Sequence, residues 1–317
     1  MEVMLSLKTL EGQVRVFHVN NPASGNGNGA KLFHKINKEF ELNSLDHEAV
    51  QTKHAGHGTD IIKNLNFNDY DVLAVSGGDG SLFEVINGYF ANQSSKRIPL
   101  AVIPVGRGNA FARDLDFHPH MWNDAIHNIY FNKTKKVDVA VCKANGEQFH
   151  FLNILGLGFV TDVARTAFKL RAFGHLSYIL GVLHRTISLK SFSLKIEIDD
   201  KVLERENVFV EISNSRYTGK DFLMAPTALI DDGYLDVVLL NKLSRTRLLQ
   251  CLPKIFTGEH VNMKEVEYFK AKKIKIETEP QKFITPDGQL VGSTPIEVEC
   301  LNKTLEVITR DDSQNTE

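Results

Sequence analysis

The first 115 residues alternate predicted strands with segments of helical periodicity. The strands, most of them apolar and rich in β-branched residues, lie at 14–19, 48–52, 72–75 and 98–103. Apolar residues at three- and four-residue spacing predict helices at 30–40, 58–65, from 81 to about 90, and from 110 to 115. Repeated strand–loop–helix units predict a doubly wound parallel sheet.

The pattern changes near residue 133. Short strands separated by polar turns are predicted at 137–142, 149–155, 194–198, 208–212, 235–240, 274–277, 296–300 and 304–308. Helical periodicity interrupts them at 160–170, 176–187 and 245–256. This favours an antiparallel sandwich-like or barrel-like second domain. With a boundary at 132–136, we expect an α/β domain at 1–134, a β-rich domain at 135–310 and a disordered polar tail at 311–317.

Composition narrows the protein class. The 317 residues are 42% apolar and 24% charged, which is ordinary for a globular protein, and the net charge of −2 offers no bulk attraction to nucleic acid. Three scattered cysteines, Cys142, Cys251 and Cys300, predict a reducing compartment without disulfides or cysteine-bound metal. Neither a signal peptide nor a membrane span is expected, so a cytoplasmic protein is predicted.

The candidate chemistry centres on the turn after the strand at 72–75. Its sequence, Ser76-Gly77-Gly78-Asp79-Gly80, precedes the predicted helix. Glycines let the backbone approach a ligand, and free N–H groups at a helix start favour a phosphate. A carboxylate beside bound phosphate is useful if it holds Mg²⁺ or accepts a proton. A plain strand-to-helix turn is the alternative.

Two further loops, at 20–29 and 104–109, follow other predicted strands. In parallel sheets ligands bind at the carboxyl ends of the strands, so all three loops should share one edge. The chain lacks the P-loop sequence G-x-x-x-x-G-K-[ST]. Gly25, Gly27 and Gly29 also lack the third glycine of the dinucleotide fingerprint, which disfavours a Rossmann dehydrogenase.

Four motifs carry a family resemblance. They are Asn-Pro-Ala-Ser-Gly at 21–25, Gly-Gly-Asp-Gly-Ser at 77–81 with Glu84, Asn87 and Gly88, Pro-Val-Gly-Arg-Gly-Asn at 104–109, and Asp-Asp-Gly-Tyr-Leu-Asp at 231–236. With them the chain resembles the diacylglycerol kinase catalytic-domain family, which includes sphingosine kinases and soluble bacterial lipid kinases. The likeness runs from about residue 14 to 308. NAD kinases and phosphofructokinases share the first part of the second motif, but not the combination.

The resemblance implies an ATP-binding α/β domain, a β-rich second domain and a cleft between them in which a lipid alcohol is phosphorylated. It assigns nucleotide and phosphate contacts to Asn21, Pro22, Ala23, Ser24, Gly25, Thr52, Gly77, Gly78, Asp79, Gly80, Ser81, Gly106, Arg107, Gly108 and Asn109. It also implies a structural Mg²⁺ held by the Asp232 carboxylate and the carbonyls of Leu229 and Tyr234. From the residues alone, 231–233 is a hairpin turn.

The family's late Asp-Gly-Glu motif corresponds here to Asp287-Gly288-Gln289. Asp287 would be the catalytic base, with Asp79 as the competing candidate; from the residues alone, Asp287 is a turn residue. Two positions depart from the family: Gln289 replaces a glutamate, and Arg107 replaces the usual threonine. Arginine at 107 would still clamp a phosphate; the alternative is that it reflects a different acceptor or donor.

Three functions are therefore weighed: an ATP- and Mg²⁺-dependent lipid kinase, an NAD kinase-like enzyme for a soluble acceptor, and a catalytically silent nucleotide- or lipid-binding protein. Residues 159–187, rich in apolar side chains with interleaved cations, would contact the membrane peripherally. The alternative is two amphipathic helices packed on the β-rich domain. No nucleic-acid partner is expected, and the oligomeric state is open, a homodimer included.

Overall fold

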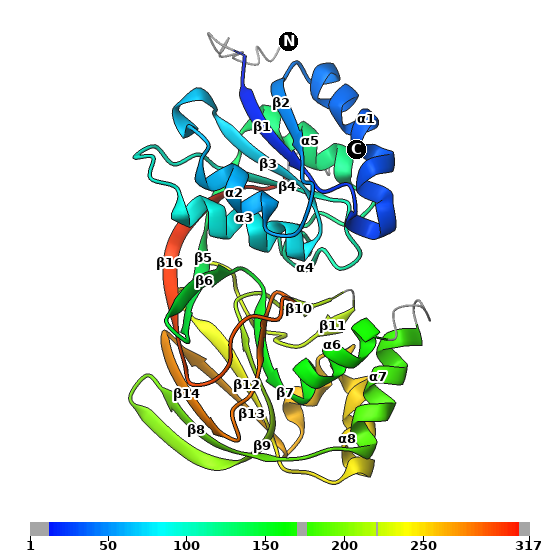
Figure 1. Ribbon diagram of the computed structural model, residues 1–317, viewed down its shortest axis with the longest axis vertical. Coiled ribbons are helices and arrows are strands. Elements are labelled where there is room, and N and C mark those ends of the chain that lie inside the picture. The colour runs from blue at the N-terminus through cyan, green and yellow to red at the C-terminus, as the bar shows by residue number, and fades with distance from the viewer. Residues whose placement is uncertain (1–12, 170–175, 220, 311–317) are drawn as a thin grey trace, which may run out of the picture.

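A computed structural model describes residues 13–169, 176–219 and 221–310, and structural statements below concern these residues. The chain forms two lobes stacked along the long axis of the molecule (Figure 1). The upper lobe contains the N-terminal α/β units and the lower lobe is rich in strands. The predicted disordered tail at 311–317 lies outside the described residues. No described helix is both long enough and apolar enough to cross a bilayer.

The upper lobe is built on a parallel sheet. Its strands, in the order β2-β1-β3-β4, are β2 (Asp46–Gln51), β1 (Arg15–Asn20), β3 (Val72–Gly77) and β4 (Leu100–Pro104). All residues of β3 and β4 are buried, as expected for strands covered on both faces. The predicted doubly wound parallel sheet is thus confirmed.

Helices cover this sheet on both faces (Figure 1). They are α1 (Ser24–Leu42), α2 (His57–Lys63), α3 (Asp79–Ala91), α4 (Ala110–Asp114) and α5 (Trp122–Phe131). A single 3-10 turn, η1 (Phe67–Asp69), precedes β3. Helix α1 begins irregularly, because Gly25, Asn26 and Gly27 have positive φ; its regular part matches the predicted helix. Helix α5 was not predicted, although Ala125, Ile126 and Ile129 bury one of its faces.

The lower lobe is an antiparallel sheet in the order β13-β12-β9-β8-β14-β16, with β5, β6, β7 and β15 attached to it. Its strands are β5 (Thr134–Ala144), β6 (Glu147–Phe151), β7 (Ile154–Gly158), β8 (Phe192–Ile198), β9 (Lys201–Ser213), β12 (Leu235–Asn241), β13 (Val266–Ala271), β14 (Lys273–Glu279), β15 (Ile284–Pro286) and β16 (Ile296–Ile308). A short hairpin, β10 (Tyr217–Thr218) with β11 (Phe222–Leu223), stands apart. The expected antiparallel second lobe is confirmed.

Helices α6 (Phe159–Lys169), α7 (Leu176–Ile187) and α8 (Arg245–Cys251) lie together beside this sheet, as Figure 1 shows. Two 3-10 turns follow, η3 (Leu252–Ile255) and η4 (Glu259–Asn262). The predicted helix at 245–256 is wrong in its second half: α8 ends at Cys251, where Pro253 cannot continue the hydrogen-bond ladder.

Two other predictions are corrected. The single strand expected at 149–155 is two strands, because the backbone turns between Phe151 and Ile154 to bind a carboxylate described below. The two strands expected at 296–300 and 304–308 are one strand, β16, with a register shift between Leu301 and Leu305. Strand β13 was not predicted.

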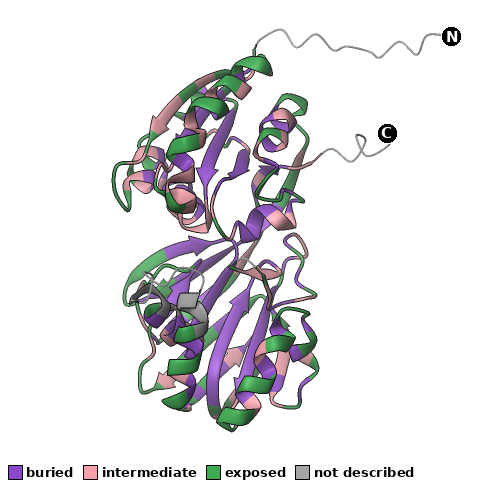
Figure 2. Ribbon diagram, turned by 90° about the vertical axis from the view of Figure 1, so that its right-hand side faces the viewer, coloured by how far each residue is buried: buried purple, intermediate pink, exposed green. Residues whose placement is uncertain are grey.

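Strands β5 and β16 connect the lobes. They pair with each other along most of their length, and Val307 near the end of β16 pairs in parallel with Leu100 of β4. One sheet therefore runs through the whole molecule. Leu305, Val307 and Ile308 belong to the apolar core of the upper lobe. Buried strands are continuous from one lobe to the other in Figure 2. The predicted boundary at 132–136 falls at the start of β5 and stays a prediction.

Candidate active site

The three glycine-containing loops meet at the carboxyl edge of the parallel sheet. The Gly106 N–H donates to the Gly77 carbonyl at 3.0 Å and also to Asn109 Oδ1 at 3.0 Å. A Cβ on Gly106 would lie 2.4 Å from the Gly78 Cα. Such close backbone approach requires glycine at position 106, and a Cβ on Gly78 would also be tight, at 3.2 Å from the Gly106 Cα. The predicted clustering of these loops is therefore what the structure shows.

The loop after β1 joins this cluster through a side chain. Asn21 Nδ2 donates to Ser81 Oγ at 2.8 Å, and Asn21 Oδ1 accepts from the Ala23 N–H at 3.0 Å. Gly25 has φ +60°, and a Cβ there would lie 2.4 Å from the Val105 carbonyl oxygen. Asn21 thus fixes the distance between the first and second loops.

A pocket of about 400 Å³, the glycine-loop pocket, opens between these loops. Of the predicted contacts, it is lined by Asn21, Pro22, Ala23, Ser24, Thr52, Gly78, Gly80 and Ser81. Gly25, Gly77 and residues 106–109 support the loops and do not line this pocket. It also contains residues that were not assigned to it from the sequence: Lys53, His54, Ala55, Glu84 and Gln289.

Glu84 organises the far wall of the glycine-loop pocket. Its carboxylate accepts from the Gly56 N–H at 2.8 Å and the Gly58 N–H at 3.0 Å. These donors lie at the start of α2, where N–H groups lack partners within the helix. Glu84 therefore ties α3 to the loop that carries Lys53 and His54. Glu84 was not assigned to the site from the sequence, although it belongs to the second family motif, which could have indicated its role.

Asp79 stands at the start of α3 and faces the start of α4. Its Oδ1 accepts from the Ala110 N–H at 2.8 Å. Loss of hydration raises the pKa of Asp79, and the backbone donors around residue 110 oppose that rise. The carboxylate is thus held between the loops at 77–81 and 104–109, where it could bind a cation.

Asp287 lies at the tip of a tight turn in the lower lobe. Asp287 and Gly288 have φ of +44° and +79°, as in the hairpin turns that Asp-Gly pairs favour. Only 6% of its surface is exposed. Its carboxylate accepts three consecutive N–H groups: Leu152 at 3.1 Å, Asn153 at 3.0 Å and Ile154 at 3.0 Å. These bonds explain the break between β6 and β7.

Burial raises the pKa of Asp287 to about 7. The three backbone donors work against that rise, whereas the nearby negative charge of Asp79 adds to it. The two candidate bases, one from each lobe, are therefore close enough to influence each other electrostatically. At neutral pH such a carboxyl exchanges a proton readily in either direction.

Both aspartates line a second cavity of about 220 Å³, the aspartate pocket. Its other walls come from the lower lobe and from α4: Ala110, Asn153, Ile154, Tyr217, Thr218, Gly219, Thr285 and Gly288. Gln289, two residues after Asp287, instead lines the glycine-loop pocket, and its Nε2 would lie 2.8 Å from a Cβ on Gly80. The turn at 287–289 therefore separates two adjoining pockets.

A third cavity, the apolar pocket, shares one lining residue, Thr218, with the aspartate pocket. It lies between the sheet and helices α6, α7 and α8, and is lined by Phe159, Val163, Val182, Phe209, Glu211, Thr218, Phe222, Met224, Leu240, Leu248, Cys251, Leu252 and Ile255. Its volume of about 40 Å³ has room for about three water-sized groups. A polar site with two carboxylates thus borders a small apolar cavity.

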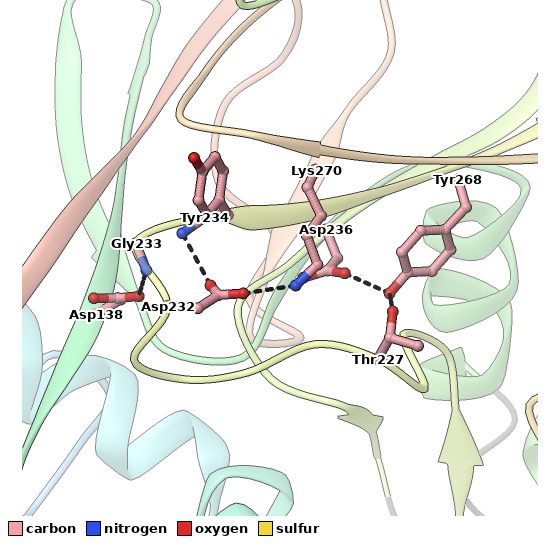
Figure 3. Close-up of polar contacts among 8 residues, drawn as sticks. All are labelled: Asp138, Thr227, Asp232, Gly233, Tyr234, Asp236, Tyr268 and Lys270. Atoms are coloured by element: carbon pink, nitrogen blue, oxygen red, sulfur yellow. Dashed lines mark hydrogen bonds and ion pairs between the residues drawn. The ribbon is translucent and has the colours of Figure 1, made fainter.

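The loop at 229–234 was expected to hold a structural Mg²⁺. Both Asp232 carboxylate oxygens have partners, the Tyr234 N–H at 3.1 Å and Lys270 Nζ at 2.6 Å (Figure 3). Lys270 lies between Asp232 and Asp236, and Asp138 accepts from the Gly233 N–H at 2.6 Å. A metal ion on Asp232 would have to displace this ammonium group. Among the described residues no cluster of three His, Cys, Asp or Glu side chains is suited to a metal.

The Lys270 ammonium group already pairs with the Asp232 carboxylate, an arrangement that does not favour Mg²⁺ at this loop. The site formed by Leu229, Asp232 and Tyr234 stays a prediction. The side chain of Leu229 is exposed. The Asp232 carboxylate forms an ion pair with Lys270. The loop is instead anchored to the lobe connection through Asp138.

Comparison with protein families matches nearly the whole chain in two parts. A model of the diacylglycerol kinase catalytic domain matches residues 15–142. A model of the YegS C-terminal NAD kinase beta sandwich-like domain matches residues 154–309. Residues 143–153 lie between the two matches and include Leu152 and Asn153, whose N–H groups donate to the Asp287 carboxylate.

Individual proteins match over the same length. A diacylglycerol kinase of Staphylococcus aureus (strain bovine RF122 / ET3-1) is 30% identical, over 94% of this chain and 93% of its own. A diacylglycerol kinase of Staphylococcus carnosus is 29% identical, over 94% and 96%. A crystal structure of a Bacillus anthracis protein assigned to the diacylglycerol kinases is 30% identical, with a TM-score of 0.78 over 95% and 96% of the two chains.

Proposed function

Because the chain belongs to the diacylglycerol kinase family, we propose that it is a lipid kinase that transfers the γ-phosphate of ATP to the hydroxyl of a lipid alcohol of the diacylglycerol type. The observation that carries this proposal is the position of Asp287. Its carboxylate lines the aspartate pocket, its turn reaches the glycine-loop pocket through Gln289, and Thr218 lines both the aspartate pocket and the apolar pocket. The relatives' names support the same acceptor class.

Asp287 is the proposed general base. A carboxylate offers about four acceptor positions, and three are filled by the N–H groups of residues 152–154. No described residue binds the remaining position, on Oδ2, so it is available to the acceptor hydroxyl. The hydroxyl oxygen then bonds to the γ-phosphorus, the bond from that phosphorus to the β-phosphate oxygen breaks, the proton passes to Asp287, and ADP leaves.

The upper lobe would supply positioning and charge stabilisation, which dominate catalysis of phosphoryl transfer. Backbone N–H groups of the loops at 21–25 and 77–81 would hold the phosphates. Arg107 is exposed beside them and would add a cation. Asp79 is the carboxylate suited to hold a Mg²⁺ that would neutralise the β- and γ-phosphates.

A soluble acceptor is less compatible with the apolar pocket, which would have no occupant. A catalytically silent protein is the other alternative, because Gln289 replaces a glutamate. However, Gln289 lines the glycine-loop pocket and is separate from the carboxylate that would accept the proton. An amide there can still hydrogen-bond a phosphate oxygen.

The test is transfer of labelled γ-phosphate from ATP to lipid alcohols in mixed micelles. We expect a chloroform-soluble labelled product with diacylglycerol and none with NAD⁺ or glycerol. Product from NAD⁺ alone would support the soluble-acceptor reading. ATP binding without any product would support the silent binder and refute the proposed activity.

Contact with a membrane is proposed for the outer face of α7 and α8. Leu180, Leu183 and Ile187 form one exposed stripe on α7, at 38%, 48% and 70% exposure, and Leu249 on α8 is 41% exposed. The opposite faces of the same helices line the apolar pocket through Val182 and Leu248. An acceptor lipid could thus pass from a bilayer to the pocket directly. Of the predicted segment 159–187, residues 170–175 lie outside the described residues.

Leu183→Glu should weaken binding to phosphatidylglycerol-containing vesicles at least about tenfold, because burial of one leucine contributes about 1.5–3 kcal/mol. Vesicle sedimentation would measure it. Leu42→Glu is the matched control, since Leu42 is 68% exposed at the C-terminal end of α1, in the other lobe. An equal loss for both variants, or no loss for Leu183→Glu, would contradict this contact face.

A further inference from the structure

Glu211 is a buried acid in an otherwise apolar wall. It lies in β9, is fully buried, and lines the apolar pocket next to Thr218. Glu211 Oε1 accepts from Thr218 Oγ1 at 2.8 Å and, more weakly, from Ser213 Oγ at 3.5 Å. Glu211 Oε2 is buried with no hydrogen-bond partner among the described residues. A buried polar atom without a partner costs free energy unless a ligand completes it.

The carboxyl group is suited to donate a hydrogen bond. The described residues offer it no ion pair, and burial raises its pKa to about 7, so a large share is neutral near physiological pH. Because Oε1 accepts from two hydroxyl groups, the acidic proton belongs on Oε2. The pocket wall therefore presents one unused donor.

The location of this donor matches one part of a glycerolipid. Thr218 contacts Glu211 and lines both the aspartate pocket and the apolar pocket. An acceptor with its free hydroxyl at Asp287 and its ester groups toward Thr218 would place those groups at this junction, beside the small apolar pocket. Ester carbonyls are neutral acceptors and complement a neutral acid.

On the premise of the proposed function, we propose that Glu211 determines acceptor specificity by donating a hydrogen bond from Oε2 to an ester carbonyl of a diacylglycerol-type lipid. Glu211 is separate from the proposed catalytic aspartates, so its effect should appear in substrate selection. A sphingoid base carries an ammonium group and would need an ionised carboxylate as its partner. The described residues that line the apolar pocket include no cation that would keep Glu211 ionised in the absence of such a ligand.

The experiment compares a diacylglycerol with the matching dialkylglycerol, which has the same hydroxyl and chains but ether oxygens in place of esters. Wild type should show a KM about tenfold lower for the diester, the value of one buried hydrogen bond. Glu211→Leu should abolish this ratio by raising the KM for the diester about tenfold, with kcat for both acceptors changed alike. Glu211→Gln keeps a donor at the same place and should retain the ratio.

Glu204→Gln, on an exposed part of β9, is the control and should retain the ratio. A ratio that survives in Glu211→Leu, or disappears in Glu211→Gln, would overturn the assignment and leave Glu211 a structural partner of Thr218. Preference of wild type for a sphingoid base, lost in Glu211→Gln, would also overturn it. If the wild type phosphorylates both lipids equally, only the role proposed for Glu211 is refuted. If it phosphorylates neither lipid, the proposed kinase function is refuted as well.

Discussion

Asp287→Asn is expected to lower kcat for lipid phosphorylation by about 10²–10⁴-fold, the usual contribution of a general base. The amide cannot accept the acceptor's proton, and its NH₂ group would oppose the backbone donors at residues 152–154. Asp287 does not line the glycine-loop pocket, so ATP affinity should change by less than about threefold. Single-turnover transfer and equilibrium ATP binding would measure the two effects separately.

Asp199→Asn is the matched control for this substitution. Asp199 also has a positive φ and accepts two consecutive backbone N–H groups, of Lys272 and Lys273, but lies in a remote turn. It should lose stability without losing activity. If Asp287→Asn retains phosphate transfer while Asp79→Asn abolishes it, the general base is Asp79 in the glycine loop and not Asp287.

The pH dependence follows from the same carboxyl group. Because burial raises the pKa of Asp287 to about 7, kcat/KM should rise between pH 6 and 8 as the base ionises. The sign for stability is opposite. The unfolded chain releases this proton near pH 4, so the group lowers folding stability progressively up to about pH 7 and not further. Wild type and Asp287→Asn should therefore differ in the slope of unfolding free energy against pH.

The sequence predicted the features that depend on local pattern. The apolar strands at 72–75 and 98–103 and the loops that follow them determine the parallel sheet and the edge at which Asn21, Gly78 and Gly106 meet. Parallel connections bring successive loops to one edge regardless of distant contacts. The edge at which the glycine-loop pocket lies was therefore predictable, whereas the family resemblance assigned eight of its thirteen lining residues.

The acceptor side depends on contacts between distant residues. Asp287 binds N–H groups 133–135 positions earlier in the chain, and no local pattern distinguishes it from an ordinary Asp-Gly turn. Only the family resemblance pointed to it. Lys270 beside Asp232, and Glu211 beside Thr218, are also pairings that only the assembled lower lobe creates. Those positions were either assigned differently or missed.

Gly106→Ala should lower the rate of phosphoryl transfer by about 10²-fold and weaken ATP binding at least tenfold. A Cβ at this position would lie 2.4 Å from the Gly78 Cα and 2.9 Å from the Gly78 nitrogen, so one loop must move. Neither neighbour is a flexible side chain that could turn aside. Displacement of reacting groups by about 1 Å can cost 10²-fold in rate, and overpacking of this kind typically costs about 1–3 kcal/mol of stability.

Gly146→Ala separates loop displacement from general destabilisation. Gly146 has φ +81° in the turn between β5 and β6, and a Cβ there would meet no atom within 4 Å. That variant carries only backbone strain, of about 1–2 kcal/mol, and should keep its ATP affinity and transfer rate. The prediction is contradicted if Gly106→Ala binds ATP normally and only its melting temperature falls, as expected for Gly146→Ala. In that case the contact between the loops at 77–81 and 104–109 would serve packing only. The nucleotide would then have to bind without the backbone donors that make the carboxyl edge of this sheet an anion site.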